Sequence, residues 1–436
     1  MVVTTAPALA DPVSKPGFIR SFPNLPGFGD PTQQQIADLA QRMLDPNADA
    51  GDNRGTTSGF TYFGQFLDHD LTLDTSPPPT APVDPTTLTN GRTFALDLDS
   101  VYGDGPGSAK SAALYDSAGR FRLQLPNRFG VDDYIRNPDG SAVINEARND
   151  ENQIIAQIQI QVMKSHNRLI DAGLKFGDAR QTLVTAYQAM IVEDFLPHIL
   201  SPSVDYKTVK EINPKKTGTP VEFAVSAYRF GHSQVRRAYV LNEPAGGTVQ
   251  VFSFTAPDLR GGRDIAADRE IDWSEFFADL PNIDTNNREI NFGRKIDTLI
   301  SSSLFLLPIP GAAATGSNVL AFRNMSRSVF YDMPSGQAVA RELGLPVLSP
   351  ATLNLGPGFE NGTPLWFYVL AESERLEDGV TLGPTGSTIV AAGFKAALKN
   401  PKSFGKVNAA QVALIRGPDN LATVSDLVVF SGANTR

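Results

Sequence analysis

The feature that most restricts the fold is the stretch ENQIIAQIQIQVMKSHNRLIDAGLKF, residues 151–176. Ile154, Ile158, Val162 and Leu169 recur within it with a period close to that of a helix face. We therefore expect a long buried helix here. Strand signals are few elsewhere, and the 32 prolines and 37 glycines are typical of many short helices joined by long loops. The sequence predicts a mainly α-helical fold with little β-structure.

Composition limits the classes of function. A chain of 436 residues with 41% hydrophobic and 19% charged residues can bury a large core, which excludes a disordered protein. The net charge of −9 argues against a surface that holds a polyanion, so no nucleic-acid partner is expected. Cysteine is absent, which excludes disulfides, iron–sulfur clusters and a cysteine nucleophile. Any metal must therefore be held by nitrogen and oxygen ligands.

Targeting and linker signals are weak. The start MVVTTAPALADPVSKPGF has neither a basic first segment nor a long apolar run, so no signal peptide is expected. No stretch approaches the roughly 20 apolar residues of a membrane-spanning helix. Residues 76–91, SPPPTAPVDPTTLTNG, are a proline-rich connector that should be a loop. No internal repeat or long low-complexity linker divides the chain, so one domain is expected.

The segment GQFLDHDLTLD, residues 64–74, uses one of only 4 histidines in the chain. On a helix, Gln65 and His69 share a face, whereas Asp68 and Asp70 are turned about 100° to either side. Surrounding aromatic and aliphatic residues favour burial over an ordinary surface or capping role. A buried carboxylate needs a cation, an arginine or a covalent bond as its partner.

A candidate cation site follows in TFALDLDSVYG, residues 93–103. Asp97 and Asp99 alternate with apolar residues, so both side chains can point the same way, and backbone carbonyls between them can add oxygen ligands. Calcium is the expected ion. The pattern is not an EF-hand, and the site would need a further acid such as Asp70. The following GDGPG lacks the rest of a dinucleotide fingerprint.

Two further segments are ordinary when taken singly. In INEARNDENQ, Arg148 precedes the long helix, and Glu151 is expected in its first turn, where a negative charge is favourable. In SAYRFGHSQVRR, Gly231 precedes His232, and its missing side chain would let a flat group approach. A lone histidine on an apolar face is more often a core residue than a ligand.

That histidine is predicted to lie on a second helical segment. Ala224, Tyr228 and His232 share one face of it, flanked by Val225 and Val235.

In combination, the segments resemble the animal-type haem peroxidases of the peroxidase–cyclooxygenase superfamily. The resemblance covers roughly residues 55 to 405, and its motifs occur in the same order. They are the distal-histidine motif GQFLDHD, the calcium loop TFALDLDSVYG, the distal-arginine region ARNDE with QVMKSHNRL, the proximal motif YRFGH, the asparagine segment LAFRNMSRSVFYDMPSG and the late helix LGPTGSTIVAAGF. The chain is shorter than the animal enzymes and has no cysteines, so it resembles a compact bacterial version.

The resemblance implies one mainly α-helical domain of the animal haem peroxidase type, with long loops and little β-structure. Residues 1–54 would be an N-terminal extension that packs on the core, 55–405 the catalytic core, and 406–436 a C-terminal segment of the same domain. The implied cofactors are haem b and Ca²⁺. The chain would be a monomer or a homodimer, and a secreted or periplasmic location is compatible with calcium.

The resemblance also implies catalytic roles. His232 would bind the haem iron through one ring nitrogen, and Asn324 would accept a hydrogen bond from the other. His69 would be the distal general base that moves a proton of hydrogen peroxide. Arg148 would stabilise charge on the departing oxygen. Gln65 would bind the distal water network or a halide.

The remaining matches concern cofactor contacts. The calcium site would be formed by Asp70, Thr93, Ala95, Asp97 and Asp99. Asp68 and Glu151 correspond to the acids that can form ester bonds to haem methyl groups. Arg229 and Arg327 match positions near the haem propionates. Asn152 stands where the chloride-oxidising member has a methionine linked to haem, so chloride should be a poor substrate.

The implied activity is peroxide-dependent oxidation of bromide, iodide, thiocyanate or phenolic donors through an oxyferryl intermediate, as part of the response to oxidative stress. A haem-dependent fatty-acid dioxygenase of the same superfamily remains the alternative. That branch uses a tyrosine three residues before the proximal histidine. Arg229 occupies this position here, and Tyr228 lies four before, although both positions face the same side of a helix as His232.

Three other classes are weaker. A metal-dependent hydrolase built on Asp68, His69 and Asp70 is disfavoured, because adjacent helical residues diverge. A serine hydrolase lacks the GxSxG elbow. An inactive binding module with the same fold would have no need for the complete residue set. The remaining histidines, His166 and His198, are expected to pack or cap near helices.

Overall fold

A computed structural model of the chain describes residues 17–47, 51–74, 81–255, 257–280, 290–308, 318–399, 403–417 and 420–435. The described protein is mainly α-helical, which confirms the predicted fold class. The longer helices are α1 (Gln33–Arg42), α2 (Ser58–Leu71), α4 (Gln153–Asp171), α5 (Phe176–Met190), α10 (Leu320–Phe330), α13 (Leu365–Leu376) and α14 (Pro384–Leu398).

Short elements join these helices. The shorter α-helices are α3 (Asp99–Tyr102), α6 (Leu196–Ile199), α7 (Val221–Val225), α8 (Gly231–Gln234), α9 (Ser302–Phe305), α11 (Gly336–Glu342), α12 (Pro350–Leu353), α15 (Ala409–Ile415) and α16 (Val424–Ser431). The described strands pair only in twos. β1 (Phe18–Ile19) runs parallel to β5 (Thr219–Pro220), and the antiparallel pairs are β2 (Asp52–Thr57) with β8 (Phe292–Arg294), β3 (Leu123–Gln124) with β4 (Asp133–Tyr134), and β6 (Ala238–Val240) with β7 (Thr248–Gln250).

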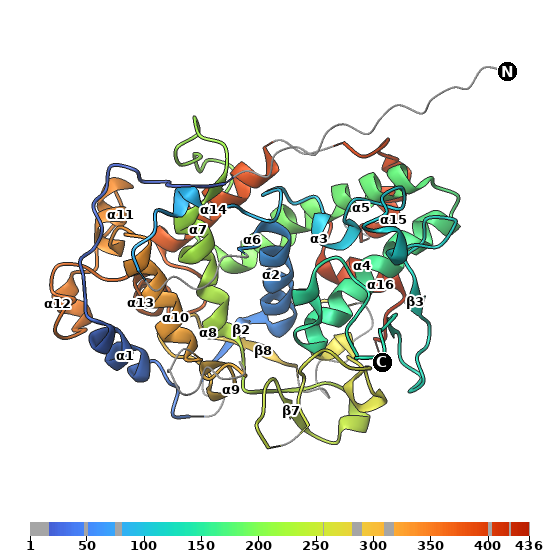
Figure 1. Cartoon of the computed structure of the whole chain (residues 1–436), viewed down its shortest axis with the longest axis horizontal. Helices are drawn as coiled ribbons and strands as arrows, with labels where there is room; N and C mark the ends of the chain where they lie inside the picture. The colour runs from blue at the N-terminus through green and yellow to red at the C-terminus, as the bar shows by residue number, and fades with distance from the viewer. Residues whose placement is uncertain are drawn as a thin grey trace.

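Helices α2 and α4 pack against each other near the middle of the protein, with α10 and α13 towards one end and α5 and α15 towards the other (Figure 1). The predicted long helix is therefore confirmed as α4. It begins where the side-chain oxygen of Asn152 accepts hydrogen bonds from the backbone of Ile154 and Ile155. Because Asn152 is the cap, Glu151 precedes the helix, and the expectation that it lies in the first turn is wrong.

The expected single helix around His232 is also wrong. The chain forms α7, breaks at Ser226 with φ −129° and ψ −79°, passes through the 3-10 turn Ala227–Phe230 and then forms α8. Ala224, Tyr228 and His232 consequently lie on three successive elements, not on one face of one helix. A 3.6-residue apolar period does not distinguish one helix from short helices joined by tight turns.

Helix α5 continues through the π-helical segment Ile191–Phe195 into α6. Glu193 accepts a hydrogen bond from the backbone of Ala422 at 2.9 Å, and Asp194 accepts one from Val424 at 2.8 Å. The next residue, Phe195, lines the main cavity. This segment therefore joins the C-terminal helices to a wall of the cavity.

The other predicted features lie in ordinary positions. His166 is fully buried in α4, with its Nδ1 2.9 Å from the hydroxyl oxygen of Tyr102. His198 in α6 stacks on Phe60 with ring centroids 4.0 Å apart. Residues 81–91 of the proline-rich connector form loops and one 3-10 turn, whereas 76–80 lie outside the described residues. None of the described helices has the length and apolar character needed to cross a bilayer.

Candidate active site

A cavity of about 750 Å³ lies between α2 on one side and the α7–α8 segment with α10 on the other. It brings together nine of the residues that the sequence predicts for haem and peroxide. They are Gln65, Asp68, His69, Arg148, Glu151, Arg229, His232, Asn324 and Arg327. These side chains come from segments more than 250 residues apart in the chain, so the fold alone creates their proximity.

His69 is the buried imidazole of the α2 wall, with 4% of the residue exposed. Burial, assisted by the nearby Arg148 guanidinium, lowers the His69 pKa to about 4, so the ring is neutral at pH 7. Its Nδ1 lies 2.7 Å from Asn149 Oδ1. The Asn149 amide nitrogen donates to Gln159 Oε1 at 2.5 Å, which directs the Asn149 oxygen to His69. This arrangement places the ring proton on Nδ1 and leaves Nε2 as a base.

Arg148 is held in the 3-10 turn Ala147–Asp150 by hydrogen bonds along its guanidinium. Its Nε donates to Glu146 Oε1 at 3.0 Å, and its Nη2 donates to the carbonyl oxygens of Thr72 at 2.5 Å and His69 at 3.3 Å. Glu146 accepts these charged bonds, and the neighbouring arginines lower its pKa to about 2 against the effect of burial. The hydrogen bonds of Arg148 to the described residues use its Nε and Nη2. Its Nη1 therefore remains available to a ligand in the cavity.

Glu151 faces the same space, and its Oε1 lies 3.9 Å from His69 Nε2. Its side chain is 43% exposed because it borders the open cavity. The surrounding protein and the nearby acids Asp68 and Glu146 raise the Glu151 pKa to about 7, although Arg148 opposes the shift. Gln65 donates a hydrogen bond to Glu151 and accepts one from Asn152 at 3.3 Å. Gln65 of α2 is therefore tied to the residues that lead into α4.

His232 lies on the opposite wall at the start of α8. Burial and the positive charges of Arg229 and Arg327 lower its pKa to about 3, so the imidazole is neutral. Asn324 Nδ2 lies 2.9 Å from His232 Nδ1, and the Asn324 Oδ1 is buried without a hydrogen-bond partner among the described residues. The amide in this orientation donates to His232, whereas the sequence led us to expect that Asn324 accepts.

Arg229 and Arg327 add positive charge beside His232. The Arg229 Nε donates to the carbonyl oxygen of Ala224 at 3.1 Å. Burial lowers the pKa of both guanidinium groups, to about 10 for Arg229; the charge of Arg327 adds to the lowering at Arg229, and the charge of Arg323 adds to it at Arg327. Two cations held together away from water favour an anionic ligand between them.

Comparisons with known proteins concern the sequence and the fold. Residues 73–256 match the sequence model of the animal haem peroxidase family. Peroxinectin A of Dictyostelium discoideum is 23% identical over 78% of this chain and 73% of its own length. The segment 73–256 thus resembles the animal haem peroxidases, the family whose motifs occur along the sequence.

Solved structures show the same fold. Peroxidase A from Dictyostelium discoideum aligns over 96% of this chain and 93% of its own chain, with a TM-score of 0.69 and 19% identity. Fatty acid alpha-dioxygenase from Arabidopsis thaliana aligns over 93% and 76%, with a TM-score of 0.60 and 12% identity. At these identities the likenesses concern the fold.

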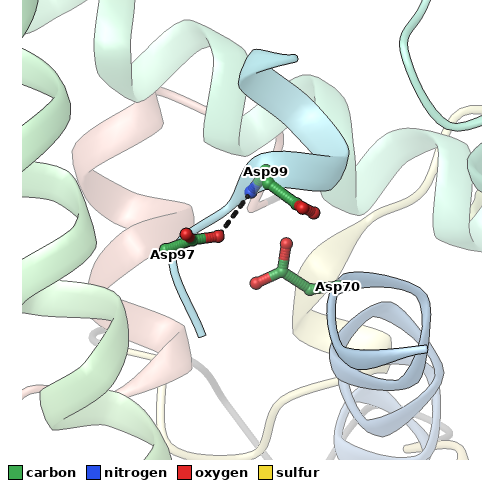
Figure 2. Close-up of side chains that lie close together, drawn as sticks. All are labelled: Asp70, Asp97 and Asp99. Atoms are coloured by element: carbon green, nitrogen blue, oxygen red, sulfur yellow. Dashed lines mark hydrogen bonds between the residues drawn. The ribbon is translucent and has the colours of Figure 1, made fainter. Parts of the chain in front are cut away.

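A second cluster lies beside the cavity and is formed by Asp70, Asp97 and Asp99 (Figure 2). One carboxylate oxygen from each residue lies within 4.8 Å of the others. Asp70 comes from α2, directly after His69, and the other two come from the segment that leads into α3. As expected for neighbouring helical residues, Asp68 faces the cavity while Asp70 faces this cluster.

The loop of this cluster has an unusual backbone. Phe94 and Leu98 adopt positive φ angles of 46° and 57°, which are uncommon for residues with large side chains. The fully buried Asp70 accepts hydrogen bonds from Ser100 and from the backbone of Leu98. Burial and the two other carboxylates raise the Asp70 pKa to about 8. Thr93, through its hydroxyl and backbone, contacts both other acids.

Two functional residues were not predicted from the sequence. Asn149 orients His69, and Glu146 holds Arg148. Both are common polar residue types, and the sequence around them is typical of the start of a helix. Their only sequence signal is proximity to Arg148 in NEARND. Ala95, predicted from the resemblance, is buried in the acidic loop, and its carbonyl oxygen accepts from the Asp97 backbone at 2.9 Å.

Proposed function

We propose that this protein uses hydrogen peroxide to oxidise small anions, such as bromide, iodide and thiocyanate, or phenolic donors. The observation that carries this proposal is the cavity in which neutral His69 and neutral His232 occupy opposite walls with Arg148 beside His69. A neutral imidazole can serve either as a metal ligand, as proposed for His232, or as a base, as proposed for His69.

The residues present fit a haem group. Gly231 has no atom within 4 Å of an added Cβ, so the wall beside His232 leaves room for a flat ligand. The unpartnered Asn324 Oδ1 gains a partner if the amide turns by 180°, because it then accepts the Nδ1 proton of His232. That proton position frees His232 Nε2 to bind iron. Arg229 and Arg327 would hold the propionates.

Bound haem would supply the iron that binds peroxide and would pass the oxidising equivalents of the peroxide to the donor. His69 would accept a proton from hydrogen peroxide at Nε2 and return it to the departing oxygen. Arg148 would stabilise the negative charge on that oxygen through its Nη1. Gln65 would orient water or a halide beside His69. The proposal includes ester bonds between haem methyl groups and Asp68 and Glu151, since both carboxylates line the cavity. Each ester would replace one methyl C–H bond by a C–O bond, a two-electron oxidation in which hydrogen peroxide is the oxidant and is reduced to water.

The acidic cluster is proposed to bind Ca²⁺. Its three carboxylates offer the oxygen ligands that this ion prefers, and the carbonyl oxygens of Thr93 and Ala95 lie in the same loop. A divalent cation would also allow the buried Asp70 to ionise. Because Asp70 follows His69 in α2, bound calcium would fix the helix that carries the base.

Halide preference follows from Asn152. Its oxygen caps α4 and its amide nitrogen donates to Gln65, so no sulfur atom can form a bond to haem at this position. We expect chloride to be oxidised poorly compared with bromide, iodide or thiocyanate. Efficient chloride turnover at neutral pH would contradict this.

A fatty-acid dioxygenase is the second candidate. Tyr228 lines the cavity, four residues before His232, and its hydroxyl donates to the carbonyl oxygen of Gly64 at 3.1 Å. Solved fatty acid alpha-dioxygenases have the same fold, so the fold is compatible with this activity. The position three before His232 holds Arg229, which favours peroxidase.

The two candidates separate in one set of assays. The purified, haem-loaded protein is given hydrogen peroxide with bromide, iodide, thiocyanate or a phenol, and in parallel linoleate with oxygen. Peroxide-dependent donor oxidation supports the proposal. Fatty-acid hydroperoxides without donor oxidation would select the dioxygenase. A protein that shows no Soret band after haem is supplied would refute both.

A further inference from the structure

A chain of ion pairs connects the acidic cluster with the catalytic arginine. Arg92, which is 5% exposed and lies directly before Thr93, is the member of this chain next to the acidic cluster. Its Nη1 is 3.5 Å from Asp99 Oδ1, and its Nε donates to Glu146 Oε2 at 3.1 Å. A single guanidinium therefore bridges a carboxylate of the cluster and a carboxylate outside it.

Glu146, which is 3% exposed, is shared in the same way. Its Oε2 contacts both Arg92 and the Nη2 of Arg148, the latter at 3.0 Å, while its Oε1 accepts from the backbone and the Nε of Arg148 at 3.0 Å each. Arg148 in turn lines the cavity. The order Asp99, Arg92, Glu146, Arg148 is thus continuous.

The charges of this group match a divalent ion. Four carboxylates, those of the acidic cluster and Glu146, face two guanidinium groups, so the ionised set has two excess negative charges. A cation bound by Asp99 repels Arg92 and draws the Asp99 carboxylate towards itself. Arg92 then interacts more strongly with Glu146. As a result, the hydrogen bonds of the Glu146 carboxylate to Arg92 and Arg148 are redistributed.

We propose that Arg92 and Glu146 form a relay through which a divalent cation at the acidic cluster adjusts the position of Arg148. Both are positioning residues, because neither one lines the cavity. The inference rests on the proposed function where it is tested by ligand binding to haem. Its other test, the affinity for calcium, does not need haem. A competing route runs along α2, where Asp70 adjoins His69, and the experiment must separate the two.

The first measurement is calcium affinity by titration calorimetry after dialysis against a chelator. Glu146→Gln should weaken calcium binding about tenfold, since the positive charge of Arg92 is then less neutralised. In an Arg92→Met background the same substitution should change affinity less than twofold, because partners in one network are not additive. Arg294→Met is the matched control, since it breaks a buried pair with Asp45 at 2.6 Å in another part of the fold.

The second measurement is cyanide affinity of the ferric haem protein with calcium and with chelator. We expect the unmodified protein to bind cyanide about tenfold more weakly without calcium, and cyanide to change calcium affinity by the same factor. Arg92→Met should reduce this factor below threefold. Arg92→Lys, which keeps the charge but not the forked donor, should retain part of it and serves if the Met variant does not fold.

Three results would overturn the relay. They are a lack of calcium binding, a Glu146→Gln effect no larger than that of Arg294→Met, and a cyanide coupling that survives in Arg92→Met and Arg92→Lys. The last result would assign the coupling to α2. If the protein takes up no haem, the proposed function fails, and the calcium titrations alone still decide whether Glu146 and Asp99 are coupled.

Discussion

The hydrogen bond between His69 and Asn149 makes a specific prediction for the pH dependence of catalysis. Asn149→Asp would place a carboxylate against the imidazole, where the Asn149 oxygen now lies 2.7 Å from Nδ1. An opposite charge at such a distance favours the protonated ring by about 1 to 3 pKa units. The His69 pKa of about 4 should therefore rise into the range of about 5 to 7.

The sign follows from the proposed role of His69 as a base. Only the neutral ring accepts the peroxide proton, so a raised pKa moves the acid limb of the rate profile to higher pH. For a shift of about 2 units, the neutral fraction at pH 5 falls about tenfold, whereas at pH 8 both proteins have a neutral ring. The unmodified protein should keep its rate down to about pH 4.

Stopped-flow absorbance of the haem protein mixed with peroxide, between pH 4 and pH 8, measures this limb. Asn149→Leu is the control, because it removes the acceptor without adding charge. It should lower the rate about 5- to 150-fold at every pH, from the roughly 1 to 3 kcal/mol that a lost buried partner costs. An Asn149→Asp profile that drops uniformly while its acid limb stays near pH 4 would refute the assigned ring proton.

Further predictions concern the cofactors. His232→Ala should abolish the Soret band of the reconstituted protein, measured by absorbance, whereas His166→Ala should keep it. Without calcium, the melting temperature should fall as pH rises from about 4 to about 8, because the folded state binds the Asp70 proton more tightly than the unfolded state does. Calcium at about 100 times its Kd should restore about 3 °C at pH 8, and Asp70→Asn should remove both effects in thermal denaturation followed by circular dichroism. Acid–acetone should fail to extract haem from the unmodified protein but extract it from an Asp68→Asn, Glu151→Gln variant, and full extraction from both would argue against ester bonds.

The sequence predicted the features that depend on local period or on a motif. The helix α4 was found from its apolar face, and the divergence of Asp68 and Asp70 followed from helix geometry. The break at Ser226 was missed, because a tight 3-10 turn keeps an apolar period similar to that of a helix.

The missed site residues depend on contacts distant in sequence. Asn149 meets His69 across 80 residues, and Glu146 meets Arg92 across 54. Nothing local distinguishes such an asparagine or glutamate from the polar residues that usually begin a helix. Motif resemblance placed Arg148 but not the groups that hold it, since those groups are set by packing in this fold.

The bonds from the π-helical segment to the C-terminal helices affect the order of events during protein synthesis. The Glu193 and Asp194 carboxylates accept hydrogen bonds from the backbone of Ala422 and Val424, and Phe195 beside them forms part of the cavity wall. A ribosome that has already released α2, α8 and α10 still retains the residues that make these bonds. If the cavity binds haem as proposed, we expect haem capture to follow release of the chain, and a nascent chain stalled before residue 422 should bind haem weakly although both histidines have emerged.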